Sequence, residues 1–365
     1  MVLPRIASLR DTAEPLELRD LPVPEPRADE LLVQVAACGV CHTELDEIEG
    51  RTPPPRLPVV LGHQVVGRVR SQGSDVGASR VGERVGVGWI HRSDGSELEN
   101  LSPAFRATGR DVDGGYAEYL TVPARYAFRI PDAFDDAEAA PLLCAGAIGH
   151  RALRLAGLAD GQALGLMGFG AVAHLVLQLA SHRFPRARIF AFARDAEVRA
   201  FALRVGADWA GPTDALAPEP LDAVVDTTPA WTPVVASLRN LRPGGRLVIN
   251  AIRKEDGDKR ALLDLSYHEH LWMEREIKSV ANITGPDSAE FLEIAAQVPN
   301  RHRSAADQLE DANRALRWLL VLIFTTVALA LVAGPTLAGT QQQVKEGMVI
   351  TGLLRNPQGG DIQGA

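Results

Sequence analysis

The sequence predicts an α/β protein in which a β-rich domain precedes a parallel sheet flanked by helices. Up to about residue 150, short apolar runs are separated by Gly and Pro breakers, as in a compact domain of short strands. From residue 151 to 274, apolar strands alternate with helical segments, which is the order of βαβ units. A chain of 365 residues is long enough to form two domains with separate cores.

The predicted strands of the first domain are short apolar runs with turn-forming flanks. They span residues 31–36, 59–61, 65–69, 81–87 and 114–122. In the last of these runs, side chains alternate as they do in a half-buried strand. We therefore expect a compact, barrel-like domain.

The second domain begins after an Ala- and Leu-rich segment at 137–156 that is helical in character. Its predicted strands are 163–167, 188–192, 221–226 and 246–250, the last after a Pro243-Gly244-Gly245 turn. One helix runs on from the first strand through residue 180, and another spans about 195–205. This alternation predicts a parallel sheet.

The C-terminal tail is atypical. Residues 318–344 contain no charged side chain, and 318–338 is a candidate membrane segment if the Gly334-Pro335 pair is tolerated near one end. The polar stretch that follows, up to residue 365, is predicted to be disordered. Three interpretations stay open for the apolar run: a fused membrane anchor, an altered reading frame or joined gene fragment, and an apolar helix buried against the body.

Composition excludes several classes of protein. Apolar residues make up 46% and charged residues 23% of the chain, as in ordinary globular proteins. The net charge of −8 and a pI near 5.6 argue against nucleic acid as the main partner. Three cysteines are too few and odd in number for a disulfide framework, and residues 1–20 lack the apolar core of a signal peptide. We expect the main body to be cytoplasmic, with reduced thiols.

A glycine pattern opens the helix after the first strand of the second domain. Gly168-x-Gly170-x-x-Ala173 stands at this strand-to-helix junction, the context that a dinucleotide-binding loop requires. Gly168 allows the tight turn, Gly170 lets a pyrophosphate approach the backbone, and Ala173 lets the helix pack against the strand. The alternative is a purely structural turn.

The end of the next strand indicates which cofactor binds. An NAD-binding protein usually has Asp or Glu there for the ribose 2′-hydroxyl. This chain has Ala193-Arg194, and Asp195 comes one place late. Arg194 could pair with a 2′-phosphate, which favours NADP over NAD. Alternatively, Arg194 is a solvated residue at the start of a helix.

Three residues are candidate zinc ligands. Cys41, His63 and Cys144 are the ligand types that zinc takes when a fourth position stays open for water or substrate. A lone buried cysteine is more often an inert apolar residue, so the prediction requires that the three converge in space. Cys38 forms a Cys-x-x-Cys pair with Cys41, but no second pair exists, so we interpret Cys38 as a packing residue.

Together, these motifs resemble a known family. Cys41-His42-Thr43-Glu44, Gly62-His63-Gln64, Asp113 to Tyr119, Cys144-Ala145-Gly146 and Gly168-Phe169-Gly170 stand in the order and spacing of the zinc-dependent alcohol dehydrogenases, within the medium-chain dehydrogenase/reductase superfamily. The resemblance covers roughly residues 1–316. It implies a GroES-like catalytic domain over 1–150, completed by 275–317, and a Rossmann domain over 151–274.

The resemblance also implies an activity. A catalytic zinc on Cys41, His63 and Cys144 would act as a Lewis acid on an alcohol oxygen, and hydride would pass between the alcohol carbon and NAD(P). The product would be an aldehyde or ketone. Thr43 matches the hydroxyl that relays the alcohol proton, and His42 would approach the cofactor phosphates.

Other positions match supporting roles. Glu44 corresponds to a carboxylate that orients His63. Asp46 stands where some relatives carry an outer relay histidine, so proton exit is expected to differ. Trp89 is a candidate wall of the substrate pocket, with plain core packing as the alternative. Gln64 replaces a glutamate of many relatives, which puts turnover rather than zinc binding in question.

A further departure from the family concerns the lobe that holds a structural zinc in some relatives. Relatives with a structural zinc carry four clustered cysteines after the Trp89 strand, but residues 91–102 contain none, so no structural zinc is expected.

Two alternative functions stay open. One is a zinc-free quinone or enoyl reductase of the same superfamily, and the other is a catalytically silent nucleotide-binding protein. We expect a homo-oligomer acting on a small alcohol or aldehyde, with membrane association only through 318–338.

Overall fold

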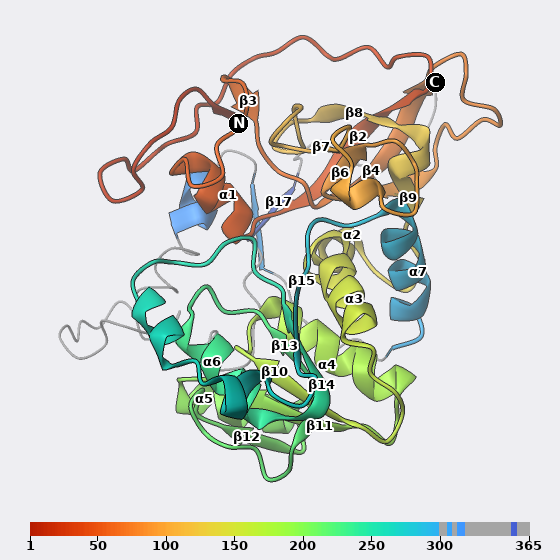
Figure 1. Cartoon of the computed structure of the whole chain (residues 1–365). Coiled ribbons are helices and arrows are strands. Elements are labelled where there is room, and N and C mark those ends of the chain that lie inside the picture. The colour runs from red at the N-terminus through yellow and green to blue at the C-terminus, as the bar shows by residue number, and fades with distance from the viewer. Residues whose placement is uncertain (299–304, 309–311, 318–351, 356–365) are drawn as a thin grey trace. The chain divides into compact units, whose positions relative to one another are not determined.

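The computed structural model describes residues 1–298, 305–308, 312–317 and 352–355, and these form two compact units (Figure 1). The first unit contains Met1–Cys144 and Asn282–Ala296, together with the described residues beyond 302. The second unit contains Ala145–Ala281 and residues 297–298. Each unit is described below by itself.

The first unit is built on a mainly antiparallel sheet. Among the described residues its strand order is β16-β17-β2-β4-β5-β9, with β8 also paired to β2. The strands are β2 (Glu30–Gly39), β4 (Val65–Gln72), β5 (Arg84–Val87), β8 (Tyr119–Pro123), β9 (Ala127–Arg129), β16 (Ala305–Gln308) and β17 (Gly352–Arg355). In β2, Leu31, Val33, Val35 and Ala37 are buried at every second position, which is the period of a strand with one face in the core.

Short elements complete the first unit. Two small antiparallel pairs join β1 (Val2–Leu3) to β3 (Val59–Val60) and β6 (Ile90–Arg92) to β7 (Arg106–Ala107). The helices are α1 (His42–Ile48), α2 (Asp136–Ala139) and α7 (Gly285–Ala295), with 3₁₀ turns η1 (Glu99–Leu101), η2 (Ala124–Tyr126) and η3 (Ala140–Leu143). Residues 312–317 are also helical.

The second unit is a six-stranded parallel sheet in the order β12-β11-β10-β13-β14-β15. Its strands are β10 (Ala163–Met167), β11 (Arg188–Phe192), β12 (Trp209–Gly211), β13 (Leu221–Asp226), β14 (Leu241–Ile249) and β15 (Glu276–Ser279). Its helices are α3 (Ala145–Ala156), α4 (Ala171–Arg183), α5 (Ala196–Arg204) and α6 (Thr232–Asn240), with shorter turns η4 (Lys259–Asp264) and η5 (Tyr267–Leu271). This is the predicted doubly wound arrangement of βαβ units.

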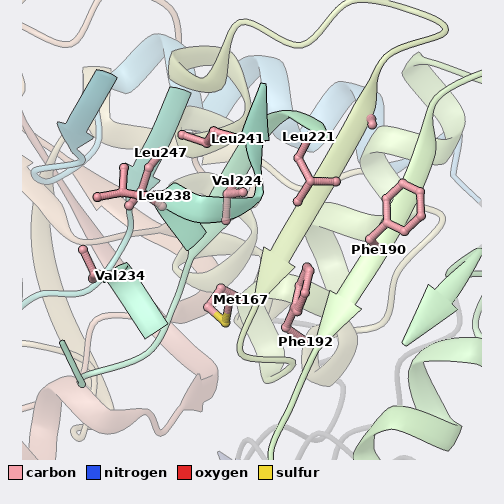
Figure 2. Packing of buried hydrophobic residues seen from close by; sticks show 10 residues of the cluster. Met167, Phe190, Phe192, Leu221, Val224, Val234, Leu238, Leu241 and Leu247 are labelled. Atoms are coloured by element: carbon pink, nitrogen blue, oxygen red, sulfur yellow. The ribbon is translucent and has the colours of Figure 1, made fainter. Parts of the chain in front are cut away.

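The core of the second unit lies where α6 packs on the central strands (Figure 2). Met167 of β10, Phe192 of β11 and Val224 of β13 meet Val234 and Leu238 of α6, and all five are almost completely buried. Because both faces of a parallel sheet are covered, its strands read as continuous apolar runs, which is why β10 and β11 were predicted with the observed bounds.

Three predicted elements differ from the structure. The helix predicted over 137–156 is interrupted at Cys144, which separates η3 from α3 and has φ −124° and ψ −78°. The strand predicted over 114–122 begins only at Tyr119, because residues 114–116 hydrogen-bond to the 60–62 segment instead. The turn predicted at 243–245 lies within β14, where the register with β13 shifts and Gly244 has φ +71°.

The tail bears on two expectations. Within the described ranges, no helix has both the length and the apolar character needed to cross a bilayer. The candidate membrane segment 318–338 lies outside the described residues. In the stretch that the sequence predicts to be disordered, Gly352–Arg355 form β17, which pairs antiparallel with residues 37–39 of β2. A free strand edge offers unpaired backbone groups for such an addition.

Candidate active site

The three predicted ligands converge within the first unit. The ligand atoms of Cys41, His63 and Cys144 all lie within 4.8 Å of one another. His63 Nε2 is 3.6 Å from the Cys41 Sγ and 3.3 Å from the Cys144 Sγ. Zinc with ordinary Zn–S and Zn–N bond lengths in tetrahedral geometry gives N···S edges of about 3.5 Å, so the donor types and spacing fit this metal.

Local backbone features present each of the three side chains. Cys41 is the extended N-cap of α1, and its Sγ accepts a hydrogen bond from Thr43 N–H at 3.4 Å. His63 follows Gly62, whose φ is +95° and where a Cβ would come within 2.5 Å of the Tyr116 ring, so glycine is needed at this turn. Cys144 occupies the break between η3 and α3.

One carboxylate holds two of the ligands. Glu44 is fully buried; its Oε2 accepts the Cys41 backbone N–H at 2.7 Å, and its Oε1 lies 2.7 Å from His63 Nδ1. A carboxylate only accepts, so this contact favours a proton on Nδ1 and leaves Nε2 as the ligand atom that faces the two thiols. The capping box that starts α1 is therefore also the support of the site.

The residues of the site shift one another's pKa values. Burial alone would lower the pKa of His63, but the Glu44 carboxylate and the Cys41 sulfur outweigh it and raise that pKa well above its usual value. The neighbouring Cys144 thiol, followed by burial and Glu44, raises the pKa of Cys41. Both shifts favour the protonated forms of these side chains, so a metal bound here would displace their protons.

The glycine-rich loop that was predicted to bind the cofactor joins β10 to α4. Gly168 has φ +78°, and a Cβ on it would come within 2.9 Å of Thr227 and Thr228. Gly170 is the N-cap of α4 and makes no side-chain cap, so the first N–H groups of this 13-residue helix are not capped by that residue. Ala173 is fully buried, as close packing of this helix requires.

Comparisons with known proteins agree with this geometry. Residues 27–132 match the alcohol dehydrogenase GroES-like domain. A protein of Mycobacterium tuberculosis named "Probable alcohol dehydrogenase AdhA" is 42% identical over 313 residues, which cover 83% of this chain and 88% of that protein. An alcohol dehydrogenase of Geobacillus stearothermophilus is 30% identical over 326 residues, covering 85% and 93%. The chain belongs to the alcohol dehydrogenases of the medium-chain dehydrogenase/reductase superfamily.

A solved structure extends the likeness to the whole fold. A Sinorhizobium meliloti protein described as a "putative zinc-binding dehydrogenase" and bound to NADP superposes with a TM-score of 0.74 at 25% identity, covering 93% of this chain and 95% of that one. The fold class and the family resemblance predicted from the sequence are thus confirmed. The protein is an NAD(P)-linked oxidoreductase of alcohols and carbonyl compounds.

Other predicted residues of the dehydrogenase lie around the ligands. Thr43 is half-buried in the first turn of α1, and His42 beside it is exposed. Asp46 is buried and its Oδ1 accepts from Arg51 Nε at 2.6 Å, so this carboxylate is engaged in an ion pair. Gln64 is buried beside Gly39, and its Oε1 has no hydrogen-bond partner within the described ranges.

Cys38 lies apart from the ligand group. It is fully buried, and its Sγ donates to Gly39 O at 3.7 Å. A Cβ added to Gly62 or Gly115 would come within 2.9 Å of this sulfur. Burial raises the pKa of Cys38, and Glu44 adds to the effect. These surroundings suit the packing role expected of it.

The segment after β11 was predicted to select the cofactor, and it lies among the described residues. Asp195, the acid that comes one place late, is the N-cap of α5 and accepts from Glu197 N at 2.6 Å and Val198 N at 3.3 Å. One oxygen of its carboxylate, Oδ1, therefore caps the helix. Arg194 is exposed, and Arg199 donates to the Ala193 and Arg194 carbonyls at 2.8 and 2.7 Å.

Sequence reasoning missed several residues near the site. Trp89 was expected to wall the pocket, and its ring meets His63 edge-on with 4.9 Å between centroids. Its partner Asn282, the buried Glu99 and the buried Glu47 were not predicted. Glu47 lies three positions after Glu44 on α1, and a carboxylate pair at this spacing shares one helix face, which is the signal that was available.

Proposed function

We propose that this enzyme is a single-zinc, NADP-preferring alcohol dehydrogenase whose zinc is held by Cys41, His63 and Cys144. The convergence of two thiols and one imidazole at zinc-like spacing carries the proposal. The cysteine count supports one metal rather than two, because the chain has only Cys38 beyond the two ligand cysteines. Residues 91–102, where relatives with a structural zinc carry four cysteines, have none.

Each residue has a distinct part in the proposed reaction. When bound, zinc supplies Lewis-acid polarisation of the alcohol or carbonyl oxygen. Glu44 keeps His63 in the ligating tautomer and orients Cys41 through its backbone N–H. The Thr43 hydroxyl, two residues from Cys41, takes the proton of the substrate alcohol and passes it outward. His42, exposed beside it, approaches the cofactor phosphates.

The cofactor binds at the glycine-rich loop. Gly168, Gly170 and Ala173 let the pyrophosphate reach the N-terminus of α4. Arg194 is exposed and pairs with the 2′-phosphate of NADP, while Asp195 is occupied as a helix cap and does not serve a ribose hydroxyl. A guanidinium matches a phosphate in geometry as well as charge. Arg194→Ala should raise the KM for NADP by tenfold or more (about 1.4 kcal/mol) and leave that for NAD unchanged; equal effects on both would exclude this role.

We also propose that the enzyme works as a homo-oligomer. The four residues of β15, at the edge of the second unit's sheet, are all exposed, and an edge strand presents unpaired backbone groups to a second copy. Sedimentation of the purified protein measures the state directly, and a monomer at working concentration would refute the proposal.

A kinetic screen with metal analysis tests the function. Short, branched and aromatic alcohols are offered with NAD and with NADP, and zinc per chain is measured on the same sample. We expect alcohol-dependent NADPH formation that disappears in Cys41→Ala. Less than about half a zinc per chain in an active reductase would favour the zinc-free quinone or enoyl reductases. Zinc without alcohol-dependent turnover would favour a silent nucleotide-binding protein.

A further inference from the structure

The cysteine-free lobe, residues 91–102, is anchored by polar contacts. Glu99 in η1 is buried with 1% of its surface exposed; its Oε2 accepts the Tyr126 hydroxyl at 2.6 Å and its Oε1 accepts the Gly285 N–H at 2.7 Å. Gly285 is the first residue of α7, so a lobe carboxylate binds a helix N-terminus 186 residues away in the chain. The lobe and the start of α7 are thus fixed together.

Asn282, three residues before α7, links this anchor to Trp89. Its Nδ2 donates to the Asn100 carbonyl of the lobe at 2.9 Å, and its Oδ1 accepts the Trp89 Nε1–H at 2.9 Å. The side-chain amide of Asn282 therefore donates to the lobe and accepts from Trp89. Its φ of +55° is a conformation that asparagine tolerates better than most residues.

The orientation of the Trp89 indole matters because of what the ring touches. It stands edge-on against the imidazole of His63, with an interplanar angle of 78°. The indole carries a single N–H donor, so the hydrogen bond to Asn282 selects one orientation of the ring about its side-chain torsions. Trp89 is only half-buried, which leaves part of the ring available to a molecule beside the ligand group.

We propose that Asn282 is a positioning residue that fixes the Trp89 indole beside His63 and thereby sets which alcohols the enzyme accepts. The proposal deepens the proposed function and rests on it. Asn282 acts through its hydrogen bond with Trp89, and its second contact is the Asn100 carbonyl of the lobe.

Three variants separate the parts of this network. Asn282→Gly keeps the left-handed backbone and removes both hydrogen bonds. Asn282→Asp keeps an acceptor for the Trp89 N–H but cannot donate to the Asn100 carbonyl. Tyr126→Phe is the matched control, because it removes a lobe hydrogen bond without touching Asn282 or Trp89.

The direct readout is the indole N–H signal of Trp89 in NMR spectra of the full-length protein. The chain has five tryptophans, and the signal that vanishes in Trp89→Phe belongs to Trp89. We expect it to shift and to lose protection from solvent exchange in Asn282→Gly, and to keep its position and protection in Asn282→Asp and in Tyr126→Phe. Zinc content is measured for every variant and should not change, because none alters a ligand.

The kinetic readout is the ratio of kcat/KM between the best and the poorest alcohol of a short, branched and aromatic series. We expect Asn282→Gly to reduce this ratio about tenfold, mainly through KM, and Asn282→Asp to restore it. An unchanged Trp89 signal or an unchanged ratio in Asn282→Gly would overturn the proposal, as would an Asp variant that behaves like the Gly variant. A wild-type protein without zinc or alcohol turnover would instead remove the proposed function, and the indole signal would still decide the positioning role.

Discussion

Replacing Glu44 with glutamine tests how one buried side chain supports the metal site. Each carboxylate oxygen lies 2.7 Å from a nitrogen: Oε2 accepts the Cys41 backbone N–H, and Oε1 lies beside His63 Nδ1. A glutamine has one accepting oxygen and must turn its NH₂ toward the other N–H, which leaves two donors facing each other. A buried unsatisfied polar group costs about 1–3 kcal/mol. We therefore expect Glu44→Gln to weaken zinc binding by about 10–100-fold, or roughly 1.4–2.7 kcal/mol.

Glu47→Gln is the matched control. Glu47 lies on the same helix and is equally buried, but neither of its carboxylate oxygens has a hydrogen-bond partner among the described residues. Burial, with Glu44 as a second cause, raises the pKa of Glu47 well above its usual value, so the neutral form of this carboxyl group is favoured. The Glu47→Gln variant therefore replaces it with another neutral group. Zinc competition with a chelator at pH 7 measures both variants. A Glu44→Gln affinity within about threefold of wild type, or an equal loss in Glu47→Gln, would refute the reasoning.

Two further predictions concern stability. Burial lowers the pKa of His91 to about 4, opposed by Glu30 and assisted by Arg92. Because the unfolded chain then binds the extra proton between pH 6.5 and 4, the free energy of unfolding should fall by about 3 kcal/mol over that window, and urea titrations of His91→Phe should lack this loss. Lys254 donates to the buried Asp226 and to the Thr228 carbonyl, so Lys254→Met should cost about 3–5 kcal/mol in urea unfolding. Adding Asp226→Asn should recover most of this cost, and a double variant no more stable than the single one would contradict the assignment.

The fold was largely accessible from the sequence, and its second unit most clearly. The runs at 163–167 and 188–192 became β10 and β11 with the predicted bounds, because buried parallel strands are continuous apolar segments between turns. Cys144 shows the opposite case. The Ala- and Leu-rich composition of 137–156 predicted helical character throughout, whereas the structure breaks at Cys144, whose Sγ lies 3.3 Å from His63 Nε2. Propensity cannot show a break that a tertiary contact imposes.

Some residues of the candidate site were predicted from the sequence, and others were not. Cys41, His63 and Cys144 were found from ligand chemistry and motif spacing, and the structure brings them together. Asn282 and Glu99 were not found, because their partners lie far along the chain: Trp89 is 193 residues from Asn282, and Gly285 is 186 residues from Glu99. No local pattern in a single sequence records such pairs.

The count of zinc ions per chain, measured with activity in wild type and in Cys144→Ala, tests the central claim most directly. The account predicts one zinc per chain in a wild-type enzyme that reduces NADP with an alcohol, and loss of both zinc and activity in the variant. Two zincs per chain, an active wild type without zinc, or a Cys144→Ala variant that keeps its zinc and its activity would contradict it.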